Sequence, residues 1–159
     1  MRSGAPSPIL NSALGGTQGS GRMGPSLDSN QLRIHLLGGF RVWVGPRAIS
    51  DSAWRLSKSK AIVKLLALTP GHRLHRDQIL DILWPDLPAD AAANNLHQTL
   101  HAARRTLSSG SAAIAKNGAL SLGGQILTLS TPGSLWVDVD AFRSAVDAKI
   151  GRASCRERV

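Results

Sequence analysis

The sequence is poor in several kinds of residue that mark particular classes of protein. Its 159 residues include one cysteine, two phenylalanines and no tyrosine, and ten acidic residues stand against nineteen lysines and arginines. The single Cys155 excludes a disulfide framework and a cysteine-based metal site. No apolar run approaches the ~20 residues that span a bilayer, and the N-terminus lacks the basic, apolar and cleavable pattern of a secretory signal. We therefore expect a cytoplasmic protein with no membrane partner.

Catalytic signatures are also missing. The chain has five histidines and ten acidic residues but no HExxH, GxSxG, Walker or CxxC pattern. His75, Asp77 and Asp81 are the one set with metal-ligand spacing, and one turn of acids on an amphipathic helix is usually its solvated side. We expect a protein that is not an enzyme and that holds no cofactor and no metal.

Composition divides the chain into four segments. Residues 1–31 are rich in Gly, Ser and Pro and too poor in apolar residues to offset their ordering entropy, which predicts a disordered tail, with Met23 as an alternative start. Residues 32–132 have the content of a folded domain. Residues 133–148 start a helical segment that is too short to be a domain by itself. Residues 149–159, KIGRASCRERV, look like a translated sequencing adapter, so we leave them out of functional reasoning.

The basic excess is concentrated in one part of the chain. Residues 32–109 hold eleven Lys and Arg against five Asp, whereas residues 110–148 are slightly acidic. Such a concentration is typical of a phosphate-binding surface. A basic segment would also suit RNA or an acidic membrane, so the charge by itself discriminates weakly.

The stretch 90–108, DAAANNLHQTLHAARRTLS, has the strongest periodicity in the sequence. A helix would place an apolar stripe on one side, made of Leu96, Leu100, Ala103 and Leu107. The opposite face would carry Asn94, Gln98, His101 and Arg105. Amide, imidazole and guanidinium groups without a carboxylate suit an anionic target with readable hydrogen-bonding edges. We therefore interpret this stretch as a DNA-recognition helix.

The preceding residues predict a small sheet and two helices. Residues 32–49 alternate roughly between apolar and polar or basic residues, and they contain the turn signals Gly38-Gly39 and Gly45-Pro46. This pattern predicts an antiparallel meander of three or four short strands. A helix is expected over 57–69, capped by Ser57 or Ser59, with a buried stripe of Ala61, Ile62, Leu65, Leu66 and Leu68. A short strand at Leu74 and a helix over 73–84 follow, and 85–89 reads as a stiff loop. Two helices, this loop and the helix 90–108 form a helix-turn-helix arrangement.

The residues after 108 predict a β-hairpin. Residues 112–115 and 120–122 read as strands around Lys116-Asn117-Gly118, because an Asn-Gly pair is a strong hairpin signal. A turn at Gly123-Gly124 and another strand over 126–130 come next. A hairpin directly after a recognition helix has the position of a wing, and its basic tip Lys116 would face a minor-groove phosphate.

Several anchors in this order resemble a known family. They are LLGGF at 36–40, LLAL-x-PG at 65–71, LW at 83–84, NNL at 94–96 and VDVDAF at 137–142. Together they resemble the winged-helix DNA-binding domain of AfsR/SARP-type bacterial transcriptional activators, which is related to the OmpR/PhoB type. The resemblance implies an α+β fold: a winged helix-turn-helix with an N-terminal antiparallel sheet, three helices and a C-terminal β-hairpin wing. It also implies that VDVDAF opens a helical activation domain that is truncated here.

The resemblance further implies which residues bind. The third helix would read the major groove of promoter direct repeats, and the loop before it would touch RNA polymerase through Pro85, Asp86, Leu87 and Pro88. The DNA-contacting residues of the family's helix map to Asn94, Asn95, Gln98, His101, Arg104 and Arg105. From their chemistry we add His97, Arg55, Lys58, Lys60, Arg76, Trp84 and Lys116, of which Trp84 would donate its indole N–H to a phosphate.

The chain departs from the family pattern at several positions of this helix. Ala102 stands where relatives often carry Arg, and His97 and His101 replace commoner residues, which leaves the preferred base sequence open. We expect a sequence-specific DNA-binding transcriptional regulator, an activator, with double-stranded DNA and RNA polymerase as partners and a dimer on DNA as a further option. The alternative is a basic protein-interaction module without DNA specificity.

Overall fold

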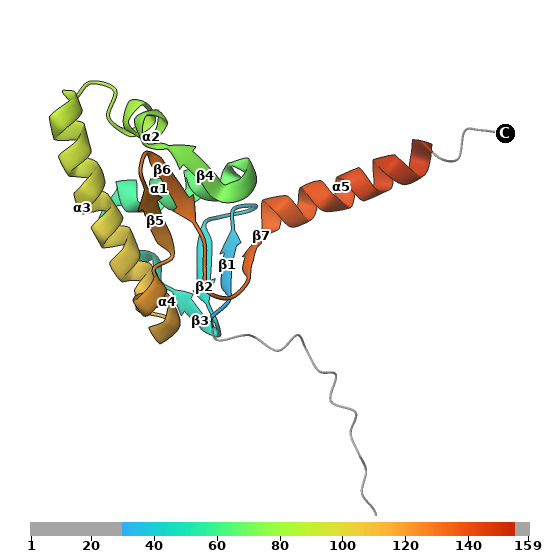
Figure 1. Ribbon diagram of the computed structural model, residues 1–159. Coiled ribbons are helices and arrows are strands. Elements are labelled where there is room, and N and C mark those ends of the chain that lie inside the picture. The colour runs from blue at the N-terminus through green and yellow to red at the C-terminus, as the bar shows by residue number, and fades with distance from the viewer. Residues whose placement is uncertain (1–29, 155–159) are drawn as a thin grey trace, which may run out of the picture.

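A computed structural model describes residues 30–154, with the side chains described through residue 150. The predictions for most of the N-terminal tail and for residues 155–159 lie outside this part of the chain. The described part is an α+β structure of five α-helices and two small sheets (Figure 1). The elements are β1 Leu32–His35, β2 Arg41–Val44, β3 Arg47–Ile49, η1 Asp51–Ala53, α1 Ser57–Leu68, η2 Pro70–His72, β4 Arg73–His75, α2 Arg76–Leu83, α3 Ala89–Ser108, α4 Ala112–Asn117, β5 Leu120–Gly123, β6 Ile126–Leu129, β7 Leu135–Val137 and α5 Asp138–Ser154.

The first sheet has the strand order β3-β2-β1-β7. The meander predicted over 32–49 is confirmed, since β1–β2 and β2–β3 pair antiparallel. Alternate residues of these strands point into the core, where Leu32, Ile34, Val42 and Val44 are buried. The fourth strand, β7, pairs parallel to β1. The sheet is therefore not purely antiparallel, and residues 135–137, predicted to lie beyond the domain, form one of its edges.

The second sheet corrects the predicted hairpin. Residues 112–117 form the helix α4 and not a strand, so Lys116 lies near the end of a helix. Alanine favours helix, and Gly118, with φ of 73°, ends α4 through its N–H to the Ile114 carbonyl. The Asn-Gly pair thus terminates a helix. The hairpin forms one step later, between β5 and β6, with Gly124 (φ 61°) in its turn, and β4 completes the sheet order β4-β6-β5.

Helices α1 and α3 pack directly against each other. The apolar stripe predicted for α3 is confirmed, because Leu96, Leu100, Ala103 and Leu107 are all buried. On α1, Ile62 and Leu66 are buried as predicted, together with Val63 and Ala67. The other residues of the predicted stripe are not buried, since Ala61 and Leu65 are half-buried and Leu68 is exposed.

The predicted serine cap of α1 is wrong. Leu56 is the N-cap residue and no side chain caps the helix there. Ser59 lies on the buried face of α1, and its hydroxyl donates to the Thr99 carbonyl of α3 at 3.1 Å. The serine therefore joins two helices and does not start one.

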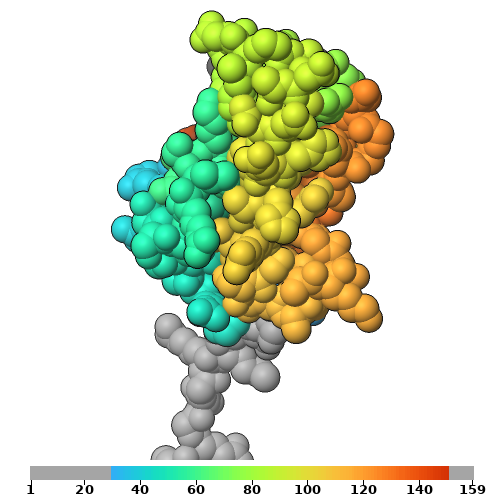
Figure 2. All heavy atoms as spheres, turned by 90° about the vertical axis from the view of Figure 1, so that its left-hand side faces the viewer, coloured from blue at the N-terminus to red at the C-terminus, as the bar shows by residue number. Residues whose placement is uncertain are grey.

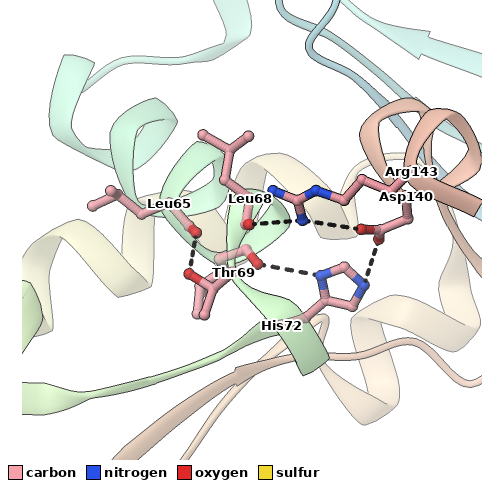
Figure 3. A network of polar contacts seen from close by, with 7 residues as sticks. Leu65, Leu68, Thr69, His72, Asp140 and Arg143 are labelled. Atoms are coloured by element: carbon pink, nitrogen blue, oxygen red, sulfur yellow. Dashed lines mark hydrogen bonds and ion pairs between the residues drawn. The ribbon is translucent and has the colours of Figure 1, made fainter. Parts of the chain in front are cut away.

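The first turn of α5 is attached to the rest of the molecule at two places. The Asp138 carboxylate accepts hydrogen bonds from the backbone N–H groups of Leu36 and Leu37 at 2.9 Å. The His72 ring lies with Nδ1 3.2 Å from the Leu66 carbonyl and Nε2 3.2 Å from an Asp140 carboxylate oxygen (Figure 3). Beyond this turn, α5 extends away from the two sheets (Figure 1). A helix beginning near Val137 was predicted, and these contacts fix the direction in which it leaves.

The substitution Leu100→Ala tests the α1–α3 packing. Leu100 is 1% exposed, and removing a buried leucine side chain costs about 2–5 kcal/mol because of lost burial and the cavity left behind. We expect a clear drop in the urea unfolding midpoint. The exposed His97→Ala on the same helix is the matched control and should change stability by less than about 0.5 kcal/mol. Equal losses in both variants would contradict this packing.

Candidate nucleic-acid interface

Helix α3 presents a continuous polar surface along one side of the molecule. Its 20 residues begin directly after Pro88, which ends the stiff loop, and Asp90 lies in the first turn, where a carboxylate suits the helix dipole. The exposed predicted residues are Asn94, His97, Gln98, His101 and Arg105, and Asn95 is half-buried. Figure 2 shows this face, with α3 running between η1 and the start of α1 on one side and α4 and the hairpin on the other. The structure thus brings the predicted helix residues other than Arg104 together on one side of α3.

The rotation of α3 about its axis is fixed by polar contacts as well as by its apolar stripe. The hydroxyl of Thr106 donates to the Ala53 carbonyl of η1 at 3.2 Å and is also 3.1 Å from the Ala102 carbonyl. Thr106 and Thr99 are both buried. A rotation of α3 that swung its outer face inward would break the Thr106 bond to η1 and would bury the amide, imidazole and guanidinium groups of that face without partners.

Arg104 is held within the protein. Its Nε donates to the Leu120 carbonyl of β5 at 2.8 Å, and the residue is half-buried. This contact fixes α3 to the hairpin. A DNA phosphate bound by Arg104 would have to share the guanidinium with this carbonyl. Arg105, the next residue, is exposed on the outer face.

The cluster predicted at the start of α1 is largely engaged in internal contacts. Lys58 donates from Nζ to the Leu83 carbonyl at the end of α2, where a cation suits the helix dipole, and it lies 4.8 Å from the Trp84 ring centre. Lys60 forms an ion pair with Asp51. Trp84 itself is only 8% exposed. These three side chains therefore hold α1, α2 and η1 together, whereas Arg55 just before α1 is exposed.

Two further predicted residues lie near the hairpin side. Arg76 is the first residue of α2, half-buried, and its backbone N–H donates to the Gln125 carbonyl in the β5–β6 turn at 2.6 Å. Lys116 is exposed near the C-terminal end of α4. The prediction that Lys116 forms the hairpin tip is wrong, since Gly124 and Gln125 occupy the turn between β5 and β6.

The loop between α2 and α3 is exposed throughout its predicted contact residues. Pro85, Asp86, Leu87 and Pro88 are all accessible, with Leu87 at 40% exposure. Two prolines and the Leu87 N–H to Trp84 carbonyl contact of 3.3 Å restrict this loop. It therefore presents an apolar side chain and a carboxylate on a short, constrained segment beside the start of α3.

Sequence reasoning missed one feature of this face. Arg55, His101 and Arg105 line a common groove of about 430 Å³ between η1 and the C-terminal half of α3. Arg55 is far from the other two in the sequence, and no periodicity links it to α3. Only the packing of η1 against Thr106 brings it there.

Within the residues that the structure describes, no group of three His, Cys, Asp or Glu side chains lies close enough to hold a metal ion. His75 instead caps α2, its Nδ1 accepting from the Asp77 N–H at 3.3 Å. None of the described helices combines the length and the apolar composition needed to cross a membrane.

The comparisons with known proteins add no family assignment. No family model matches the chain, and no curated protein matches it. Fold and site therefore define an α+β domain with an exposed, polar and basic helix face.

The pair Arg104→Ala and Arg105→Ala tests the different positions of these neighbours. Arg104→Ala should lower the free energy of unfolding by about 1–3 kcal/mol, because it leaves the buried Leu120 carbonyl without its partner. Arg105→Ala, at an exposed position, should change it by less than about 0.5 kcal/mol. Urea denaturation followed by circular dichroism measures both values. A larger loss for Arg105→Ala would mean that α3 is rotated differently.

Proposed function

We propose that this protein is a sequence-specific DNA-binding transcriptional regulator of the winged-helix type, in which α3 reads the major groove. The observation that carries the proposal is the outer face of α3, where amide, imidazole and guanidinium side chains are exposed and residues 91–108 contain no carboxylate. Asparagine and glutamine pair with adenine edges, and arginine pairs with guanine edges or phosphates, so this face has the groups that base readout needs.

The arrangement around α3 supports the same proposal. Helices α1, α2 and α3 are followed by the short helix α4 and then by the β5–β6 hairpin, and the short strand β4 between α1 and α2 pairs with β6. Apart from the inserted α4, this is the order of elements that a winged helix has, with β5–β6 as the wing. The wing turn carries Gly124 and Gln125, so its contribution to a phosphate contact would come from backbone N–H groups and an amide.

The division of roles along α3 follows from exposure. Asn94, His97 and Gln98 lie in the N-terminal half, the part of a recognition helix that contacts base edges. His101 and Arg105 lie in the C-terminal half beside Arg55, a grouping of basic side chains that suits the DNA backbone. The resemblance to AfsR/SARP-type activators supports a role in activation, with the loop Pro85–Pro88 as the contact to RNA polymerase.

Selection from a random duplex library with the full chain tests the proposal. We expect an enriched sequence, and Gln98→Ala should weaken binding to it by about 1–3 kcal/mol, roughly 5- to 150-fold, while binding to a shuffled duplex changes little. Arg41→Ala is the matched control, because Arg41 is exposed on β2 in the other sheet. A mobility-shift titration measures each affinity.

Three outcomes would contradict the proposal. If no sequence is enriched, or if Gln98→Ala binds both duplexes as the wild type does, α3 does not read bases. If the chain instead binds an acidic protein at high salt and binds no duplex at low salt, it is the basic interaction module that was the alternative. A DNA complex is expected to weaken steeply with salt, because bound cations release counterions from the duplex.

A further inference from the structure

The groove beside the C-terminal half of α3 has the composition of a ligand site. Its volume of about 430 Å³ lies within the usual range for small-molecule pockets, ~300–1,000 Å³. Ala53, Leu56 and Ala102 contribute small or apolar side chains, and Leu56 is 42% exposed although it is a large apolar residue. Arg55, His101 and Arg105 add three basic side chains. A mostly apolar wall with a few convergent polar groups is typical of small-molecule sites.

The basic side chains of the groove are free to bind. In the part of the chain that the structure describes, the side chains of Arg55, His101 and Arg105 make no hydrogen bond and no ion pair with another residue. Other basic residues nearby are engaged, since Lys60 pairs with Asp51 and Arg47 donates to the Ser109 carbonyl. Asp51, the acidic residue of η1, forms its ion pair with Lys60, and no acidic residue of the described chain lines the groove. The groove has an unbalanced positive charge.

The groove is also preformed. Thr106 joins α3 to the Ala53 carbonyl in one wall, and the neighbouring Arg47 contact to Ser109 joins β3 to the end of α3. Since both walls are fixed by these bonds, the backbone needs little ordering when a ligand enters and only the arginine side chains must be ordered, which favours binding.

We propose that this groove binds an organic anion that carries a phosphate or carboxylate on an apolar body, and that such a ligand competes with duplex DNA. Arg55 and Arg105 would bind the anionic group, and Leu56 and Ala102 would contact the apolar body. The competition follows because Arg105 and His101 belong to the outer face of α3, and this part of the inference rests on the proposed function. A DNA phosphate on its deoxyribose has similar chemistry, so the experiment must separate the two sources.

Isothermal titration of the full chain in the absence of DNA separates them, with 2-naphthyl phosphate as the probe. We expect saturable binding, at least about tenfold tighter than that of inorganic phosphate or of neutral 2-naphthol, because each lacks one of the two parts. Arg55→Ala and Arg105→Ala should each weaken it about tenfold, since each removes a charge-assisted contact. Arg41→Ala should leave it unchanged, and Ala102→Phe, which fills the groove, should abolish it.

The groove proposal is overturned if 2-naphthyl phosphate does not bind, if inorganic phosphate binds equally well, or if both arginine variants bind like the wild type. If Arg55→Ala and Arg105→Ala weaken duplex binding but not probe binding, the groove binds the DNA backbone and the ligand proposal fails. If 2-naphthyl phosphate binds but no duplex does, the proposed anion site is supported and the proposed DNA-binding function is contradicted. When both bind, saturating probe must raise the duplex dissociation constant, and an unchanged constant contradicts the competition.

Discussion

The burial of one side of α3 against α1 is the interaction on which the other features depend. Leu96, Leu100 and Leu107 leave only one rotation of the helix that hides its apolar stripe. Small rotations of α3 would break the hydrogen bonds from Ser59 to the Thr99 carbonyl and from Thr106 to the Ala53 carbonyl, although they would leave the apolar stripe buried. Hydrophobic burial thus sets the size of the free energy that holds α3 on α1, and the hydrogen bonds of the buried hydroxyls fix the rotation of α3 about its axis. The polar outer face is the consequence of this packing.

The same packing distributes the basic residues between two roles. Arg104, Lys58 and Lys60 form contacts inside the molecule and stabilise the assembly of α1, α2, α3 and the hairpin. Arg55 and Arg105 remain accessible and meet at the groove. The number of lysines and arginines therefore overstates the positive surface available to a ligand, because some of these side chains are bound to other groups of the protein. The part supplied by Arg55 and Arg105 lies at α3, where the proposed DNA contact and the proposed organic anion would compete.

Local patterns predicted α3, the meander and the strand at Leu74 well, because helical periodicity and strand alternation reflect which face is buried. They failed where the deciding contact is distant. Residues 135–137 form a strand only because β1, about 100 residues earlier, offers a free edge. An Asn-Gly pair such as Asn117-Gly118 can form a hairpin turn or end a helix. Here the alanines before it favour the helix α4, and the pair ends it. Ser59 resembled a cap, but its partner Thr99 lies on another helix.

Photo-crosslinking tests most directly whether the outer face of α3 contacts DNA. A benzoylphenylalanine at position 97, an exposed place on α3, is compared with the same group at position 41, an exposed place on β2. With a labelled duplex carrying the selected sequence, irradiation should join DNA to the protein from position 97 and not from position 41. Crosslinking from position 41 alone would show that another surface contacts DNA and would contradict the account.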